Sequence, residues 1–279
     1  MVIRRIGETC GPALLFYAPR YAVDMQSTHT DLALHPHSAF AQAARQIAAQ
    51  GFAFVQGVDA AGALELGSAD SADTATFLAS WQRLELDMFL ADGGKYRLRR
   101  HDSLIQTFDP PALSPVPYRP HWQPKQYNTL HGGIFRTFAQ IEPAVLGGAT
   151  MHRIITALGA LFAALMPTPR WHVEAHQFRL DARSGQALPT PEGAHRDGVD
   201  YVALVMIERG EVTGALTTIY NTHGQEIGRT TLSTRWSLML LDDARVTHAT
   251  TAIAASGARA WRDTLVVTYR KDGFLQQTK

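Results

Sequence analysis

The sequence predicts an α+β protein with a mainly β core, because helical and strand signals are unevenly distributed along its 279 residues. From about residue 170 onward, short apolar and β-branched runs are separated by glycine-containing and polar turns. Before that point, three segments carry apolar residues at helical spacing. Many short strands of this kind are typical of a barrel or jelly roll, which the helices are expected to brace.

The domain organisation follows from the chain length, which suits one large domain. We expect a single domain over residues 1–279. Residues 1–168 are expected to form a helical and strand extension with scaffold helices, and residues 169–279 the jelly-roll core with the chemistry. The apolar faces of the first part require a surface that covers them, so this part is not expected to fold separately.

Charge is nearly balanced along the chain. There are 26 Lys and Arg residues against 25 Asp and Glu residues, which gives a formal net charge of +1. No long run of one sign occurs, so the composition does not support a nucleic-acid or membrane-surface partner. Arg97, Arg99 and Arg100 form a small basic cluster, for which a solvated strand face is one interpretation. Arg99 is also considered as a substrate-binding residue.

The expected location of the protein is the cytoplasm. Cys10 is the only cysteine in the sequence, so no disulfide can form within the chain. No secretory signal is visible at the N-terminus, and a reducing compartment is therefore expected. The longest strongly apolar stretch, residues 157–166, is too short to cross a membrane.

The first part of the chain begins with a short predicted strand at 13–17. Ser38 is a good N-cap for a helix whose apolar residues recur at helical spacing, and Gly51 is expected to end it. Residues 52–55 read as a strand. A second helix is expected over about 71–87, with apolar side chains on its inner face.

The middle of the chain combines a strand, a loop and a helix. Residues 95–108 alternate, which predicts a strand. Residues 109–124 contain six prolines, so an irregular loop is expected there, of a length that is often functional, such as a lid. Pro143 suits the first turn of a scaffold helix that ends at Met166. The later strands are expected at 171–180, 201–207, 215–220, 227–232, 236–241, 246–252 and 264–270.

The motif Pro-Glu-Gly-Ala-His-Arg-Asp-Gly occupies residues 191–198, just before an apolar strand. His195 and Asp197 are two residues apart, so in an extended strand their side chains point to the same face. A third ligand follows the next long apolar strand, at His248. Two histidines and one carboxylate that leave open positions on the metal are typical of non-haem Fe(II) sites that activate dioxygen.

A carboxylate-binding pair follows on the last predicted strand. Arg262 and Thr264 share one face, and the planar guanidinium fork suits a carboxylate. Beside an open iron site, such a receptor fits the distal carboxylate of 2-oxoglutarate, whose 2-oxo acid end would chelate the iron. Arg259 is the alternative residue for this role, but it lies in a probable loop, so we favour Arg262.

The order His-x-Asp, His, Arg-x-Thr resembles the Fe(II)- and 2-oxoglutarate-dependent dioxygenases built on a double-stranded β-helix. More narrowly, residues 191–198 and the strand from Arg262 resemble the bacterial group that contains L-isoleucine 4-hydroxylase. The close resemblance covers about 170–270. It implies a cupin-like jelly roll with N-terminal and bracing helices. It also implies His195, Asp197 and His248 as catalytic metal ligands.

The resemblance further implies Fe(II), 2-oxoglutarate and dioxygen as the cofactor and co-substrates. The expected reaction is hydroxylation of an unactivated C–H bond in a free amino acid or similar small molecule, with succinate and CO₂ as co-products. Two alternatives remain open: the same chemistry on a carrier-tethered or protein-bound amino acid, and a non-catalytic or non-oxidative metal-binding cupin module. A homodimer also remains open.

Candidate substrate-binding residues come from less specific patterns. Gln177 and Arg179 share one face of the strand before the motif. If that face lines the core, they lie near the metal and could bind a carboxylate or an amine; if not, they form a polar outer face. Asn128, Arg136 and Glu192 are further candidates.

The remaining histidines and the chemistry of zinc offer alternatives to the iron site. His172 and His176 are interpreted as structural or supporting residues, and His35 and His37 as surface residues. Zinc hydrolases also use two histidines and a carboxylate, but no helical His-Glu-x-x-His motif is present. A zinc site would also leave the Arg-x-Thr strand without a role.

Overall fold

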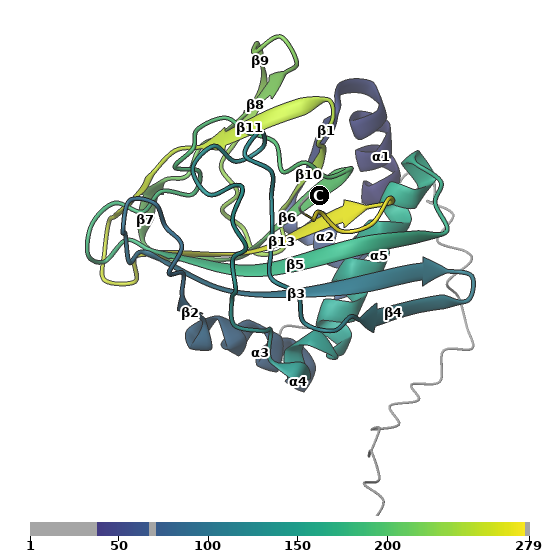
Figure 1. Ribbon diagram of the computed structural model, residues 1–279, viewed down its shortest axis with the longest axis horizontal. Coiled ribbons are helices and arrows are strands. Elements are labelled where there is room, and N and C mark those ends of the chain that lie inside the picture. The colour runs from purple at the N-terminus through teal and green to yellow at the C-terminus, as the bar shows by residue number, and fades with distance from the viewer. Residues whose placement is uncertain (1–37, 67–70, 277–279) are drawn as a thin grey trace, which may run out of the picture. The chain divides into compact units, whose positions relative to one another are not determined.

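The computed structural model describes residues 38–66 and 71–276. Every helix and strand below belongs to one compact unit, Leu34–Lys279. The strand predicted at 13–17 and the histidines at 35 and 37 lie outside the described residues. Within these limits the structure is mainly β with bracing helices, as a jelly roll of this kind requires (Figure 1).

The main sheet has eight antiparallel strands in the order β1-β10-β6-β13-β5-β3-β2, with β4 pairing with β3. Their bounds are β1 Phe52–Val55, β2 Glu85–Leu86, β3 Arg97–Phe108, β4 Pro111–Pro115, β5 Arg170–Asp181, β6 Tyr201–Arg209, β10 Leu238–Asp242 and β13 Trp261–Arg270. Strands from both halves of the sequence therefore build one sheet.

Two smaller sheets complete the β structure. The first has the order β11-β8-β9, with bounds β8 Thr217–Asn221, β9 Glu226–Thr230 and β11 Val246–Thr250. The second pairs β7 Val212–Gly214 with β12 Ile253–Ala255. Because the sheets remain separate, the described strands do not form one closed barrel.

The helices pack on one face of the main sheet, and in Figure 1 α5 crosses behind β5 and β3. Their bounds are α1 Ala39–Gln50, α2 Gly57–Ala63, α3 Ala72–Ala79, the 3₁₀ helix η1 Ser80–Arg83, α4 Pro143–Leu146 and α5 Ala149–Leu165. On this side Val173 and Ala175 of β5 join Ile154 and Leu158 of α5 in the largest apolar cluster, where all four side chains are fully buried. The opposite face of β5 is thereby left for polar side chains.

Three predicted elements differ from the observed ones. The helix expected over 71–87 is α3 followed by η1 and ends at Arg83. The helix expected from Pro143 to Met166 is divided at Gly147 and Gly148, because α4 ends there and a new N-terminus begins. The proline-rich segment contains strand β4, whose prolines stand at both ends of an edge strand, where a missing N–H is tolerated.

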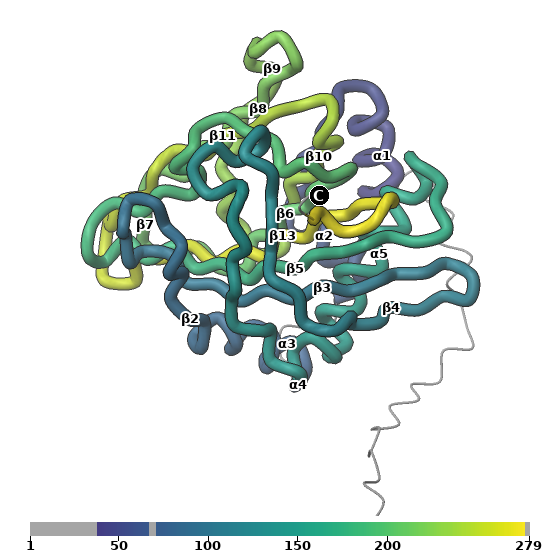
Figure 2. Tube along the Cα trace, viewed as in Figure 1, coloured from purple at the N-terminus to yellow at the C-terminus, as the bar shows by residue number. Residues whose placement is uncertain are grey.

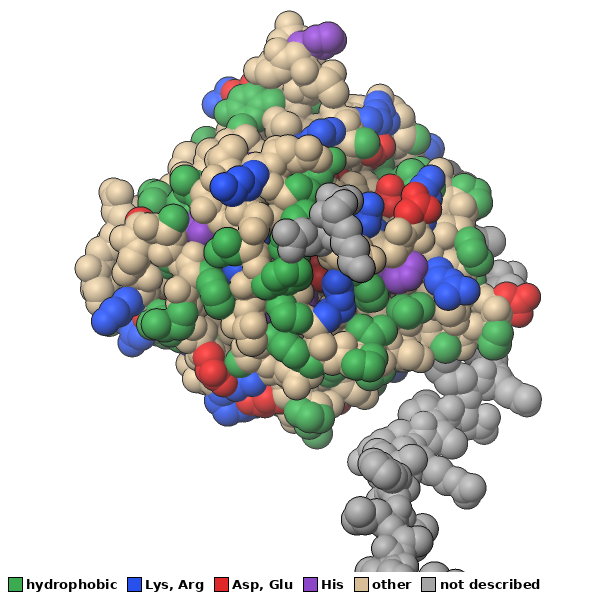
Figure 3. Space-filling view, viewed as in Figure 1, with side chains coloured by type: hydrophobic (Ala, Val, Ile, Leu, Met, Phe, Trp, Pro, Cys, Tyr) green, Lys and Arg blue, Asp and Glu red, His purple; other side chains and the backbone are tan. Residues whose placement is uncertain are grey.

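The chain between β4 and α4 rises across the front of the main sheet toward β11 and returns (Figure 2). Its two limbs are joined by paired backbone hydrogen bonds between His121 and Arg136, with N···O distances of 2.9 Å in both directions. This crossing segment covers the polar face of the main sheet. On the face of the molecule shown in Figure 3, basic and acidic side chains are scattered without a large area of one sign.

Candidate active site

A cavity lies on the polar face of the main sheet. Its walls come from β3, β5, β6, β10 and β13 of that sheet, from β11 of the second sheet, and from the crossing segment. Apolar side chains such as Val202, Leu204 and Met239 line part of it, and charged groups line the rest. The predicted metal ligands and the predicted carboxylate receptor all line this one cavity.

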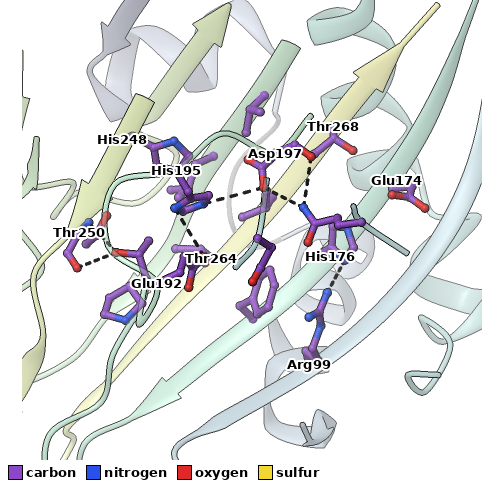
Figure 4. Close-up of a pocket in the computed structure, with 18 of the residues that line it drawn as sticks. Arg99, Glu174, His176, Glu192, His195, Asp197, His248, Thr250, Thr264 and Thr268 are labelled. Atoms are coloured by element: carbon purple, nitrogen blue, oxygen red, sulfur yellow. Dashed lines mark hydrogen bonds and ion pairs between the residues drawn. The ribbon is translucent and has the colours of Figure 1, made fainter. Parts of the chain in front are cut away.

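His195, Asp197 and His248 meet at one end of the cavity, and one donor atom from each lies within 4.8 Å of the others. The two imidazole rings are 4.5 Å apart between centroids, and His195 Nε2 is 4.0 Å from an Asp197 carboxylate oxygen. Figure 4 shows the three side chains together, with Glu174 and His176 on β5 across the cavity. The spacing is that of a set of ligands around one metal ion.

The backbone that positions these ligands differs from the predicted one. His195 and Asp197 precede β6 and lie in a loop, not in the strand itself. The loop is held by an isolated bridge to β11, in which the backbone N–H groups of His195 and His248 donate to each other's carbonyls at 3.1 and 3.0 Å. Gly198 then turns the chain with φ of +82°, a conformation that favours glycine.

Asp243 fixes this loop and was not predicted as a site residue. Its carboxylate accepts hydrogen bonds from the backbone N–H groups of Asp197, Gly198 and Val199, at 2.9, 2.8 and 3.1 Å. Burial and the nearby Asp197 raise the pKa of Asp243 to about 7, against the opposing effect of the donated hydrogen bonds. The one feature of the sequence that could have indicated Asp243 is its position directly after a buried strand.

The donor chemistry of the two histidines suits a metal. His195 Nδ1 lies 3.1 Å from the carbonyl of Gly193, to which a protonated Nδ1 donates, and this leaves Nε2 as a ligand atom. His248 Nδ1 is buried and has no hydrogen-bond partner among the described residues. Burial and the neighbouring His195 hold the pKa of His248 well below its usual value, so its ring is neutral, as a ligand must be.

Acidic neighbours complete the electrostatics of this end of the cavity. Burial alone would lower the pKa of His195, but the carboxylates of Asp197 and Glu192 raise it above its usual value. Glu192 lies 3.5 Å from His195 Nδ1. A site that stabilises positive charge on an imidazole also stabilises a bound cation, so the residues present fit a divalent metal.

Arg262 and Thr264 line the same cavity from β13. The Arg262 side chain is buried, with 3% of the residue exposed, and its Nε has no partner within the described part of the chain. Burial and the nearby Arg209 lower its pKa to about 10, which leaves the guanidinium charged at neutral pH. Arg259 instead lies on the surface, where it pairs with Glu208 at 2.7 Å, and it does not line the cavity.

The candidate substrate residues divide into two groups. Asn128, Arg136 and Glu192 line the cavity. Gln177 and Arg179 lie on the opposite face of β5, which corrects the expectation that they lie near the metal. Gln177 donates to Ser80 Oγ of η1 at 2.8 Å, and Arg179 is held by Asp263 at 2.6 and 2.7 Å.

The cavity contains a polar wall that the sequence-based interpretation identified only in part. Arg97 and Arg99 are buried and line it, so these two residues of the basic cluster do not belong to a solvated strand face. His121, Glu174 and His176 line the same wall. The two-residue spacing on β3 and β5 was a usable signal, but sequence alone could not tell which face of each strand was covered.

Comparison with known proteins agrees with this geometry. A family model described as 2OG-Fe dioxygenase matches residues 78–268. The chain therefore belongs to the 2OG-Fe dioxygenases, whose members use Fe(II), 2-oxoglutarate and dioxygen. No match was found among curated protein sequences.

Three solved structures are similar to this chain. The structure of a bsmA homologue from Methylobium petroleophilum PM1 is 39% identical, with a TM-score of 0.80, and the match covers 86% of this chain and 96% of that one. IDO from Bacillus thuringiensis is 16% identical, with a TM-score of 0.66 and coverages of 84% and 96%. The Fe(II)/α-ketoglutarate-dependent dioxygenase TqaL is 15% identical, with a TM-score of 0.65 and coverages of 83% and 87%. The last two show a shared fold. No helix within 38–66 and 71–276 is both long and apolar enough to cross a membrane.

Proposed function

We propose that this protein hydroxylates an unactivated C–H bond of a free amino acid or an amino-acid-like small molecule, with succinate and CO₂ as co-products. The observation that carries the proposal is the meeting of His195, Asp197 and His248 in one cavity with Arg262. Family membership supports the reaction class. The nature of the substrate rests on the polarity of the cavity and on the residues of its walls.

In this proposal His195, Asp197 and His248 hold the iron, which supplies the oxidation of the C–H bond with dioxygen and 2-oxoglutarate when bound. Arg262 and Thr264 bind the distal carboxylate of 2-oxoglutarate, since a buried guanidinium fork and a hydroxyl match that group. The apolar part of the wall excludes water from the reacting atoms.

The same proposal assigns the substrate to polar side chains that line the rest of the cavity. Asn128 and Arg136 face the cavity from the crossing segment, and Glu192 faces it beside His195. These groups offer hydrogen-bond donors, a cation and a carboxylate, which are the partners that a zwitterion requires. The crossing segment shields one side of the cavity, so a small molecule fits the site better than a folded protein substrate does.

The test is 2-oxoglutarate turnover against a panel of free amino acids. Purified protein with Fe(II) and oxygen is expected to form succinate, and one compound is expected to gain the mass of one oxygen atom. His195→Ala is expected to abolish both signals, while His223→Ala, at an exposed turn, leaves them unchanged. Metal binding without succinate formation on any compound would instead favour a non-oxidative module, and turnover on carrier-tethered amino acids alone would favour that substrate form.

A further inference from the structure

We propose that Arg97, Arg99 and Arg136 form a second anion site in the cavity, separate from Arg262, which binds an oxyanion group of the substrate. This inference rests on the proposed function, because it names the chemistry of the substrate that the same cavity would take. The three residues are called the arginine wall below. All three line the cavity and are buried.

The register of the main sheet separates the arginine wall from the 2-oxoglutarate receptor. Arg97 on β3, Leu180 on β5 and Arg262 on β13 occupy one row across three neighbouring strands. Neighbouring strands are about 4.8 Å apart, so about 10 Å separates the outer two positions of this row. The next row holds Arg99, Phe178 and Thr264 in the same way. Two distinct cationic groups therefore face one cavity.

Positive charge exceeds negative charge in this wall. Asp87 forms ion pairs with both Arg97, at 2.7 Å, and Arg99, at 3.6 Å. Arg136 donates to the neutral amide oxygen of Gln123 at 2.7 Å. Two further carboxylates act on the wall: Glu174 is paired with Arg119 at 3.0 Å, and Glu192 lies 3.5 Å from His195 Nδ1. Buried charges are costly without partners, so this excess indicates a site that a negative group completes.

The guanidiniums also have unused donors. Arg99 and Arg136 are 4% and 2% exposed, and the Nε atom of each is buried with no hydrogen-bond partner in the described chain. Arg97 Nη2 is also buried and has no hydrogen-bond partner among the described residues. A buried donor without an acceptor costs free energy, and an oxyanion supplies several acceptors at once.

Arg99 is held rigidly, as a binding group should be. Its guanidinium carbon lies 3.6 Å from the ring centroid of Phe138 and 4.4 Å from that of Phe178. Its Nη2 donates to His176 Nδ1 at 2.7 Å, a contact drawn in Figure 4. Little side-chain freedom remains to be lost when an anion binds.

Burial is the main cause of the low pKa values in this wall, and its neighbouring cations add to the effect. Burial, with the repulsion from Arg97, lowers the pKa of Arg136 to about 10. Burial also lowers the pKa of His121 to about 4, and Arg136 and His101 lower it further against the attraction of Glu174.

A cation site in the same wall is the main alternative. Donor atoms of His101, His121, Glu174 and His176 lie within 4.8 Å of one another. Neither ring nitrogen of His101 has a hydrogen-bond partner among the described residues, although Nε2 lies 3.6 Å from a Glu174 oxygen. However, Arg99 occupies His176 Nδ1, so in the neutral ring Nε2 carries the proton and cannot ligate a metal. Glu174 is already engaged by His121, and the arginines repel a dication. The arrangement favours an anion.

Sulfate is the probe for direct binding, measured by calorimetry. The protein is first loaded with Mn(II) and N-oxalylglycine, a non-reacting analogue that fills the Arg262 receptor. Wild-type protein is expected to bind one sulfate, and Arg136→Gln and Arg99→Gln each to weaken it by about tenfold or more. Arg229→Gln, an exposed arginine on β9, is the matched control and should leave sulfate binding unchanged.

The outcomes separate this inference from its rivals. Unchanged sulfate affinity in both variants, with N-oxalylglycine affinity and melting temperature intact, overturns it. So does a metal content of two ions per chain that falls to one in His101→Ala, because a cation would then occupy the wall. If Arg99→Gln fails to fold, Arg136→Gln and the charge-retaining Arg136→Lys still decide the result.

A second measurement uses the compound identified by the turnover screen and its carboxamide. With wild-type enzyme the amide at the recognised acid group is expected to lose about 10- to 100-fold in kcat/KM. Arg136→Gln should impair the acid by a similar factor and affect the amide little, whereas equal effects on both compounds contradict the proposal. Amidating each acid group in turn identifies which one binds. If no compound is turned over, the proposed function is wrong. The sulfate experiment does not depend on turnover, so it still tests the anion site.

Discussion

At the scale of single residues, the metal site depends on a carboxylate that does not face the metal. Asp243 accepts three successive backbone N–H groups from the loop that carries Asp197. Among the described residues, this loop has no strand partner beyond the bridge at His195. The direction of the Asp197 side chain is therefore set largely by Asp243.

We predict that Asp243→Asn weakens divalent-metal binding by about 10- to 100-fold, the usual effect of losing a group that orients a ligand. The amide would place a donor against backbone donors and leave at least one of them unpaired. Calorimetric titration with Mn(II) measures the effect. Asp242→Asn is the matched control, because its side chain contacts Ala244 and not the ligand loop. Equal losses in both variants would count against this role.

A second residue-scale prediction concerns the competing arginines. Arg262→Gln is expected to raise the KM for 2-oxoglutarate by about 10- to 100-fold, because a charge-assisted fork is lost. The effect on kcat should be smaller, since this contact binds ground state and transition state alike. Arg259→Gln should change neither constant. Steady-state kinetics with varied 2-oxoglutarate decides between them, and a large effect at Arg259 would reverse the assignment.

Motif spacing identified His195, Asp197, His248 and Arg262 from the sequence because metal and carboxylate chemistry restricts residue types strongly. Asp243 could not be identified in this way. It acts through backbone N–H groups, which every non-proline residue carries, so no pattern in its partners reveals it. Arg99 and Arg136 of the arginine wall were among the substrate candidates, but Arg97 was not, because an arginine on a strand is usually solvated.

At the scale of elements, two-residue periodicity shows which side chains share a strand face but not which face meets the cavity. Gln177 and Arg179 were correctly placed on one face of β5, and that face meets the helices. Glu174 and His176, one residue out of phase, face the cavity. The choice depends on where α5 packs, which is a tertiary property.

The helical layer shows a second limit of local patterns. Gly147 and Gly148 end α4 and begin α5, whose N-cap residue, Gly148, has no side chain to accept a hydrogen bond. Asp73 in the first turn of α3 takes over this function, with its oxygens 2.9 and 2.7 Å from the backbone nitrogens of Ala149 and Thr150. A cap supplied from another helix is invisible to sequence rules that look only a few residues away.

We predict that Asp73→Ala lowers the free energy of unfolding by about 1 kcal/mol at pH 7, the usual value of an N-cap. Partial burial would raise the pKa of Asp73, but hydrogen bonds from Thr150 and Ala149 hold it below its usual value. Its contribution is therefore present above that usual value and is lost as the pH falls through the lower, folded-state pKa. Denaturant unfolding at pH 7 and at acid pH measures both.

The exposed Asp59 of α2 provides the control for that experiment. Asp59→Ala should change stability by a few tenths of a kcal/mol, because its only expected contribution is the helix dipole. A difference between wild type and Asp73→Ala that persists unchanged below the folded-state pKa would show that lost packing, and not the carboxylate cap, causes the destabilisation.

At the scale of the whole molecule, the two faces of the main sheet differ in chemistry: one lines the cavity and the other packs against the helices. The cavity face carries the metal ligands and the two arginine groups. The helix face is apolar and aromatic: Phe162 of α5 stacks on Tyr201 with a centroid distance of 4.5 Å, and Tyr269 donates to the carbonyl of Ile155 at 2.8 Å. Trp171 donates to the carbonyl of Gly159 at 2.9 Å. Side chains alternate along β6 and β13, so one face of these strands packs against the helices and the other face lines the cavity.

This division predicts that stability and chemistry can be changed independently. Phe162→Ala should lower the free energy of unfolding by about 3–5 kcal/mol, because it empties a fully buried aromatic site. The melting temperature should fall by about 2–4 °C for each kcal/mol. Below the melting transition, the KM for 2-oxoglutarate and the metal affinity should match those of the wild type. The reason is that β6 and β13 still separate the cavity from the helices.

The matched variant is Ile227→Ala on the exposed β9, which should change stability little. Thermal unfolding, followed by 2-oxoglutarate kinetics well below the transition, tests both halves of the prediction. A rise in KM at temperatures where Phe162→Ala is fully folded would mean that the helix layer transmits its packing to the cavity. The sheet would then act as a deformable element, and not as the rigid support on which the positions of the metal ligands and arginines depend.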